Sequence, residues 1–170
     1  AKKALNKKNR VVYTTGVFDL LHPGHINILK KAKSFGGELV VGVQKDDSVF
    51  RQKGKNPIMT FEERAAVLES LPFVDRVVGY SDLDQRKILK VIKPDVMVQS
   101  EDWVKGSDRK AVIDYLAKNG IELKIFPYTQ GISTTMIRRR VVDSENIFRN
   151  DVDLIKKKIP PEFPLRAEIL

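Results

Sequence analysis

Both histidines of the 170-residue chain, His22 and His25, lie three positions apart around Pro23 and Gly24. They follow a β-branched run at 11–15 and precede a helical pattern, so they fall in a strand-to-helix turn. A helix N-terminus attracts phosphate through its free N–H groups and its dipole. Gly24 lets the backbone approach a ligand closely, and both imidazoles can donate hydrogen bonds from one side. The pattern predicts a phosphate-binding site.

Other chemistries fit this turn less well. No G-x-G-x-x-G follows the strand, which argues against a dinucleotide fingerprint. A zinc site is weakly supported, because the pair lacks a third histidine and the chain has no cysteine. The absence of cysteine also excludes disulfides and a cysteine nucleophile. Asp19, in the same turn, is either a turn residue or a direct ligand contact, and Phe18 is expected in the core.

The elements that must position this turn alternate in type along the chain. Five apolar runs read as strands and are separated by helical patterns. The expected strands cover 11–15, 38–43, 76–80, 95–99 and 121–126. The expected helices cover 24–35, 60–71, 84–93, 108–119 and 133–140. This order predicts an α/β, Rossmann-like single domain, with a doubly wound five-stranded parallel sheet and helices on both faces. Ligands of such sheets bind beyond the carboxyl ends of the strands.

Local signals refine these boundaries. Gly36 and Gly37 are expected to close the first helix, and Thr60 with Glu63 forms a capping-box pattern. The segment 44–59 reads as the longest irregular stretch, and long loops in α/β domains are often functional. The pattern weakens after Val142 into a short helix and a Pro-rich end. The predicted organisation is therefore a basic arm at 1–10, a domain at 11–142 and an extension at 143–170.

The formal net charge of +9 is concentrated at the ends of the chain. Residues 1–10 carry +5 and residues 138–170 carry +2, which leaves only +2 for the rest. A nucleic-acid partner is not expected, because the balanced interior supplies no cationic face. No apolar stretch is long enough to cross a bilayer, and the N-terminus lacks the apolar region of a signal peptide. We expect a soluble, cytoplasmic protein.

Two segments resemble a known family. GVFDLLHPGH at 16–25 resembles the H-x-G-H signature of the nucleotidyltransferase superfamily, in its cytidylyltransferase-like branch. TQGISTT at 129–135 is similar to the second signature of that branch. The segments at 53–64, 73–78 and 101–103 also match, in the family's order and spacing. The resemblance covers residues 11–142.

The resemblance implies an enzyme that transfers a nucleotidyl group from a nucleoside triphosphate to a phosphorylated alcohol and releases pyrophosphate. The acceptor phosphate would attack the α-phosphorus in line, without a covalent enzyme intermediate. The main prediction is CTP with glycerol 3-phosphate, phosphoethanolamine or phosphocholine. The alternative is an adenylyltransferase acting on heptose 1-phosphate or FMN, and the alternative of another class is a non-catalytic nucleotide-binding regulatory module. Mg²⁺ carried by the triphosphate and a homodimer are also implied, with no metal site made by side chains.

The resemblance also implies residue roles. His22 and His25 would donate to the α-phosphate and to the leaving oxygen, and Lys53 or Lys55, with Lys53 favoured, would bridge the phosphates. Nucleotide contacts are implied for Gly16, Val17, Phe18, Asp19, Gly24, Asp102, Thr129, Gly131, Ile132, Ser133, Thr134 and Thr135. Substrate contacts are implied for Arg64, Trp103 and Asp46. Plain alternatives remain: a helix-surface charge for Arg64, a core position for Trp103 and an N-cap for Ser133.

One position departs from the family pattern. Tyr128 stands where the second signature usually begins with an arginine, which is associated with nucleotide binding in the cytidylyltransferases. Tyrosine lacks the fixed fork of donors and the permanent charge of a guanidinium. Three alternatives follow: another cation takes the place of this arginine, the preference for the base has changed, or the chain binds nucleotide weakly. This departure affects the prediction of CTP as the nucleotide more than the prediction of nucleotidyl transfer.

Overall fold

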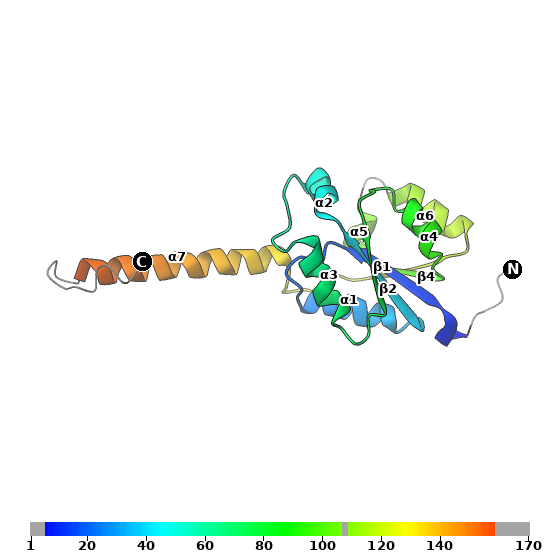
Figure 1. Ribbon diagram of the computed structural model, residues 1–170, viewed down its shortest axis with the longest axis horizontal. Coiled ribbons are helices and arrows are strands. Elements are labelled where there is room, and N and C mark those ends of the chain that lie inside the picture. The colour runs from blue at the N-terminus through cyan, green and yellow to red at the C-terminus, as the bar shows by residue number, and fades with distance from the viewer. Residues whose placement is uncertain (1–5, 107–108, 159–170) are drawn as a thin grey trace. The chain divides into compact units, whose positions relative to one another are not determined.

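The computed structural model describes residues 6–106 and 109–158, with side chains described through residue 150. The chain divides into two compact units, residues 1–132 and 133–170. All five strands belong to the first unit: β1 (Val11–Gly16), β2 (Glu38–Gln44), β3 (Arg76–Tyr80), β4 (Val96–Ser100) and β5 (Glu122–Phe126). They pair in parallel in the order β3-β2-β1-β4-β5 (Figure 1). The predicted α/β class and five-stranded parallel sheet are confirmed.

The strand order creates a switch point in the middle of the sheet. The chain builds outward from β1 to β2 and β3, then returns to place β4 on the other side of β1. Connections leave β1 and β4 in opposite directions, so a crevice opens beyond their carboxyl ends. The residues that follow β1 and β4 are therefore the ones placed to meet a ligand.

Helices cover both faces of the sheet. The helices of this first unit are α1 (Pro23–Lys33), α2 (Asp46–Lys53), α3 (Phe61–Glu69), α4 (Arg86–Ile92), α5 (Glu101–Val104) and α6 (Arg109–Lys118). Helices α1 and α3 lie on one side of the sheet, and α4 and α6 lie on the other (Figure 1). Adjacent strand residues point to opposite faces, so Val12 packs in the α1 and α3 core while Tyr13 packs in the α4 and α6 core.

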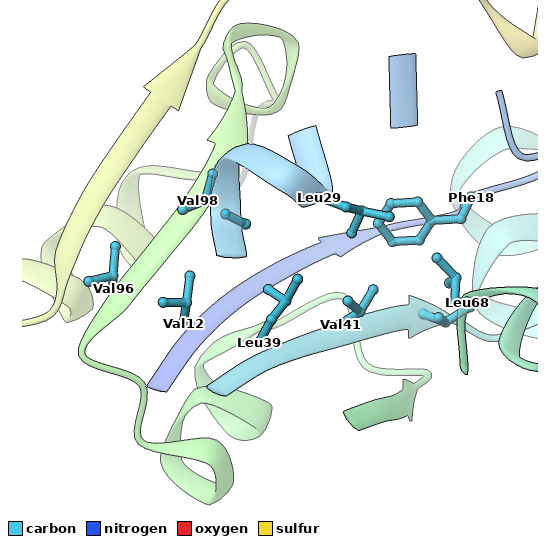
Figure 2. Packing of buried hydrophobic residues seen from close by; sticks show 10 residues of the cluster. Val12, Phe18, Leu29, Leu39, Val41, Leu68, Val96 and Val98 are labelled. Carbon is cyan, nitrogen blue, oxygen red and sulfur yellow. The ribbon is translucent and has the colours of Figure 1, made fainter. Parts of the chain in front are cut away.

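The core under α1 and α3 reaches into the turn after β1. Phe18 is only 4% exposed and packs with Leu29 of α1 and Leu68 of α3. Figure 2 shows the Phe18 ring beside Leu29, above the valine and leucine side chains of β1 and β2. Phe18 occupies the expected core position. It anchors the turn that carries the histidines to the apolar interior.

The segment 44–59 is not irregular throughout, because α2 occupies Asp46–Lys53. Asp46 and Asp47 lie in its first turn and Lys53 in its last, which suits the helix dipole, and Asp47 pairs with Arg51 one turn later. Gly54 ends the helix in a left-handed conformation at φ 67°. The sequence pattern missed this helix because its residues are mainly polar.

Gly36 and Gly37 serve a different purpose from the expected helix closure. Helix α1 already ends at Lys33, with Ser34 as its C-cap, and neither glycine has a positive φ. A Cβ on Gly37 would overlap the carbonyl oxygen of Lys8, and its N–H donates to the carbonyl of Arg10. The glycines therefore permit close approach of residues 8–10. Residues 6–10 of the predicted basic arm pack at the amino end of the sheet, and residues 1–5 lie outside the described residues.

The second unit contains α7, which runs unbroken from Thr134 to Lys158. The expected short helix after Val142 is the continuation of α7, and the expected boundary at 142/143 lies inside it. In the part of α7 whose side chains are described, Val141, Val142, Ile147 and Phe148 are all more than half exposed. The Pro-rich end lies outside the described residues. No helix in the described ranges is long and apolar enough to span a membrane.

Candidate active site

The turn between β1 and α1 holds a strained backbone at its centre. Phe18 and Leu20 have φ values of 56° and 47°, the left-handed region that residues with a Cβ seldom occupy. Between them, the Asp19 carboxylate accepts the backbone N–H groups of Ile58 and Met59 at 3.0 Å each. Asp19 is 4% exposed and joins this turn to the segment before α3. Such strain persists only where surrounding contacts hold it, and it is concentrated at functional sites.

The two histidines stack against each other at the start of α1. His22 is the N-cap, and its Nδ1 accepts the N–H of Gly24 at 3.1 Å. Its ring lies 3.8 Å from that of His25, centroid to centroid, at an interplanar angle of 23°. The edge of Phe18 packs on His25 with the centroids 5.4 Å apart. Both rings are therefore fixed in position before any ligand arrives.

Two ring nitrogens of this pair are buried without a hydrogen-bond partner in the described structure, Nε2 of His22 and Nδ1 of His25. Because Nδ1 of His22 accepts from Gly24, the proton of its neutral ring sits on Nε2. Buried polar groups without partners are rare, and each calls for an explanation. Here the unpartnered Nε2–H is a donor available to a ligand.

Burial keeps both imidazoles uncharged. It lowers the pKa of His25 to about 4, with His22 and Lys53 lowering it further and Asp19 opposing them. Burial also lowers the pKa of His22. Both rings are thus neutral at pH 7 and act as hydrogen-bond groups rather than as cations. Because the Lys53 ammonium lowers the pKa of His25, it belongs to the electrostatic surroundings of the pair.

A cavity of about 510 Å³ opens at the switch point, beyond β1 and β4. It is lined by the predicted site residues Gly16, Val17, Phe18, His22, Gly24, His25 and Thr129. Ile28, Phe126, Pro127 and Tyr128 also line it, and the Lys31 ammonium lies 5.2 Å from the centre of the Phe126 ring. The cavity thus combines apolar and aromatic surface with a pair of neutral donors.

Several other residues with predicted roles at the site do not line this cavity. Asp102 pairs with Lys105 at 3.2 Å, and Trp103 packs against the core under α4 and α6, which is the plain alternative for Trp103. Lys55 is exposed. Gly131 has a φ of 79°, and Ile132 lies beside Gly24, since a Cβ there would sit 3.6 Å from its Cγ2.

The serine and threonines of the second signature belong to the second compact unit. Ser133 Oγ accepts the N–H of Met136 at 3.2 Å, so Ser133 caps α7 as the plain alternative expects. Thr134 and Thr135 form the first turn of the same helix. Their contact with nucleotide phosphates stays a prediction.

Arg64 is neither a surface charge nor placed to touch a ligand. Its side chain has no exposed surface. The guanidinium donates to the carbonyls of Val17, Gln44 (2.9 Å) and Met59 (3.1 Å) and to Oδ1 of Asp46. The other carboxylate oxygen of Asp46 accepts the N–H of Phe61 at 3.1 Å. Arg64 and Asp46 thus tie the turn after β1 to the end of β2, which makes Arg64 a positioning residue. The Asp46 side chain is 38% exposed, and its contact with substrate stays a prediction.

The capping box explains how Arg64 reaches this place. Thr60 Oγ1 accepts the N–H of Glu63 at 3.3 Å, and a Glu63 oxygen accepts the N–H of Thr60 at 2.8 Å. The predicted capping box is confirmed. It fixes the start of α3 beside the turn, so that the next residue points inward.

A polar network missed by the sequence analysis lies behind the histidines. The Thr15 hydroxyl oxygen accepts from the side-chain amides of Gln99 at 3.0 Å and Gln85 at 3.2 Å, and all three residues are buried. A polar residue at the end of a buried strand, such as Gln99 in β4, was an available signal. Gln85 has no such signal, because it follows a loop.

The family model for cytidylyltransferase-like proteins matches residues 13–140. The chain belongs to the cytidylyltransferase-like family. The resemblance seen in the two signatures is confirmed, and with it the assignment of the chain to the nucleotidyltransferases. In this family member the matched region contains the histidine pair, Arg64 and both signatures.

Two curated proteins and one solved structure are similar to this chain. The chain is 40% identical over 140 residues to the bifunctional protein HldE of Campylobacter concisus, and 36% identical over 140 residues to HldE of Helicobacter pylori. Each match covers 82% of this chain, but only 28% and 29% of the relative. A solved lipopolysaccharide core biosynthesis protein from Thermoplasma volcanium is 38% identical, with a TM-score of 0.59. That match covers 71% of this chain and 96% of the other. This cytidylyltransferase-like chain therefore spans less than a third of the length of these curated relatives.

Proposed function

We propose that the chain transfers an adenylyl group from ATP to a sugar 1-phosphate of the heptose 1-phosphate type and releases pyrophosphate. Of the functions raised by the sequence, this alternative is the one that the HldE relatives favour, rather than the main prediction of CTP. The lipopolysaccharide core protein at 38% identity also supports a sugar acceptor, because the core of a lipopolysaccharide is a saccharide.

The observation that carries the proposal is the stacked pair of neutral histidines with unpartnered ring nitrogens at the start of α1. In the reaction, an oxygen of the acceptor phosphate attacks the α-phosphorus in line. The bond from the α-phosphorus to the bridging oxygen breaks, and that oxygen leaves with pyrophosphate. Such a step depends on positioning and on stabilising negative charge, and fixed donors provide both. Nε2–H of His22 would donate to an α-phosphate oxygen as charge develops.

Lys53 would act with the pair as a point charge. Its electrostatic effect on His25 supports a place near the reacting phosphates. An ammonium group on the last turn of α2 can reach phosphates of both substrates without fixed geometry. We propose that Lys53, rather than Lys55, holds the acceptor phosphate against the nucleotide.

The cavity wall supports adenine as the base. Ile28, Phe126, Pro127 and Tyr128 offer apolar and aromatic surface to a base in this cavity. A purine has the larger apolar face and gains more from packing against such a wall. Cytosine would miss the guanidinium that Tyr128 replaces.

Mg²⁺ would arrive with the triphosphate. In the described ranges, no group of three or more His, Asp or Glu residues could hold a metal ion. The ion would neutralise charge on the phosphates, and no step of this proposal passes through a metal held by the protein. The predicted homodimer is retained as part of the proposal.

A substrate matrix tests the function. ATP, CTP, GTP and UTP are each combined with heptose 1-phosphate, glycerol 3-phosphate, phosphoethanolamine and phosphocholine, and pyrophosphate release is followed. We expect the highest kcat/KM for ATP with heptose 1-phosphate. A clear preference for CTP with a polyol or amino-alcohol phosphate would restore the main sequence prediction. Nucleotide binding without release in any combination would instead support the regulatory module.

A further inference from the structure

A second, smaller cavity of about 290 Å³ lies at the carboxyl ends of β2 and β3. Gln44 and Tyr80, the last residues of these strands, line it together with Gln52, Gln85 and Arg109. It is separate from the cavity at the switch point, and none of the predicted site residues lines it. Its walls are mainly uncharged polar groups, with a single guanidinium.

Two polar atoms in this cavity's lining are buried without a partner in the described structure. They are Oε1 of Gln85, whose side chain is 3% exposed, and Nε of Arg109. The guanidinium of Arg109 rests 5.0 Å from the centre of the Trp103 ring, which holds it in place. A buried acceptor and a buried donor without partners each cost free energy that a ligand with hydroxyl groups would recover, because a hydroxyl both donates and accepts.

The second cavity adjoins the histidine site at one buried hydrogen bond. Gln85 donates to the Thr15 hydroxyl, and Thr15 lines the large cavity with His22 and His25. An acceptor phosphate at the histidines and acceptor hydroxyls at Gln85 would therefore lie at the same carboxyl edge of the sheet.

We propose that this cavity binds the hydroxyl groups of the acceptor sugar, with Gln85 and Arg109 as its specificity-determining residues. The proposal rests on the proposed function and names the part of the acceptor that the chain recognises. Amides and a guanidinium match vicinal hydroxyls. No carboxylate is found among the described lining residues to balance the ammonium of an amino-alcohol acceptor. The cavity thus favours a neutral polyol over phosphocholine or phosphoethanolamine.

The test compares Arg109→Met and Gln85→Leu with wild type on two acceptors, heptose 1-phosphate and ethyl phosphate. We expect each variant to raise the KM for heptose 1-phosphate at least tenfold and to leave the KM for ATP within twofold. The slow rate with ethyl phosphate, which has no hydroxyls to bind, should stay within twofold. The matched control is Lys110→Met on the same helix, since its side chain is 91% exposed. An unchanged KM for heptose 1-phosphate in both variants overturns the proposal, as does an equal loss with both acceptors.

Direct binding separates this proposal from the proposed function. Trp103 is the sole tryptophan and touches Arg109, so its fluorescence reports on the cavity. If wild type transfers no adenylyl group, the proposed function fails. A saturable fluorescence change with heptose 1-phosphate that Arg109→Met weakens at least tenfold would still support the sugar site. No change in wild type would overturn the sugar site even if transfer is observed with other acceptors.

Discussion

The two ends of the sheet differ in how completely their polar groups are paired. At the amino end, the Asp95 carboxylate accepts the N–H of Val11 at 3.0 Å, and the Asp75 carboxylate accepts the N–H of Leu39 at 2.6 Å and the Lys33 ammonium. Burial alone would raise the pKa of Asp75, but these hydrogen bonds outweigh it and hold the pKa below its ordinary value. The first residues of β1 and β2 are thus anchored by paired carboxylates.

At the carboxyl end, buried polar atoms remain unpaired in the described structure. Ring nitrogens of His22 and His25, Oε1 of Gln85 and Nε of Arg109 all lack hydrogen-bond partners. Each such atom costs about 1–3 kcal/mol. The same protein that pairs its groups at one end leaves them open at the other. The carboxyl end therefore presents open hydrogen-bonding atoms to a ligand, whereas the paired groups of the amino end anchor the strands.

The largest expected effect comes from the histidine pair. His25→Ala and His22→Asn should each lower kcat by about 10²–10⁴, because each removes a ring that the proposed transition state needs. Asparagine keeps an N-cap acceptor for α1, so the fold should survive. Pyrophosphate release measures the effect, and circular dichroism checks the fold.

Asp75→Asn at the amino end is the matched control for these variants. It should lower stability while kcat stays near that of wild type. Near-normal turnover in either histidine variant would remove the distinction between the two ends.

Acid should weaken the carboxyl end first. The unfolded His25 imidazole, with an ordinary pKa near 6.5, takes up a proton before the folded one, whose pKa is about 4. The free energy of unfolding therefore rises with pH between these values, by up to about 3 kcal/mol, and the gain is fully present above pH 6.5. Because the pKa of Asp75 is also lowered, that carboxylate is protonated only at still lower pH, and stability falls further there. Urea unfolding from pH 4 to 7.5 measures both ranges.

A His25→Gln variant isolates the imidazole. Its unfolding free energy should vary less between pH 4 and 6.5 than that of wild type, whereas Asp75→Asn should keep the wild-type slope there. An equal slope in His25→Gln and wild type would show that His25 is not held neutral by the fold.

The amino end should respond to a single methyl group. Gly37→Ala places a Cβ on the carbonyl oxygen of Lys8, so residues 6–10 must shift, and we expect a loss of about 1–3 kcal/mol with kcat unchanged. Thermal and urea unfolding measure the loss. The control is the same substitution in a chain that lacks residues 1–9, where it should cost much less. Equal cost in both backgrounds would contradict the packing of residues 6–10 described above.

The smallest effect is expected in the middle of the sheet. The Tyr13 hydroxyl is also buried without a partner in the described structure, but it lies in the core under α4 and α6 rather than at either end. Burial raises its pKa, so it stays protonated. Because Tyr13→Phe removes this unpaired hydroxyl, it should leave stability unchanged or raise it, and it should leave kcat unaltered. A drop in kcat would mean that an unpaired group serves function from inside the core.

Much of the fold and part of the site could be predicted from the sequence. Val11–Gly16 and Glu38–Gln44 are apolar runs bounded by turn residues, so their strands were identified, and His22 and His25 were marked by their spacing. Arg64 was misjudged because a charged helix residue is usually exposed. Its burial depends on the carbonyl oxygens of Val17 and Gln44, which lie 47 and 20 residues earlier in the chain, and no local pattern records such contacts.

The other differences between the sequence-based predictions and the structure also arise from contacts between residues far apart in the chain. Gly37 has a sequence context typical of a helix end, but its actual neighbour is the backbone of Lys8, nearly 30 residues earlier. Gln85 is unremarkable along the chain and acquires meaning only through Thr15, Tyr80 and Arg109 around it. The proposed sugar site therefore required the structure, whereas the proposed phosphate site could be inferred from the sequence.

¹⁵N NMR of the histidine rings during titration with a non-hydrolysable ATP analogue shows whether the open nitrogens at the carboxyl end receive the phosphates. We expect the ring signals of both His22 and His25 to shift as the phosphates meet these nitrogens, while the backbone amides of Val11 and Leu39 at the paired end stay in place. Saturable binding of the analogue with unchanged ring signals would mean that the histidine pair does not bind the phosphates.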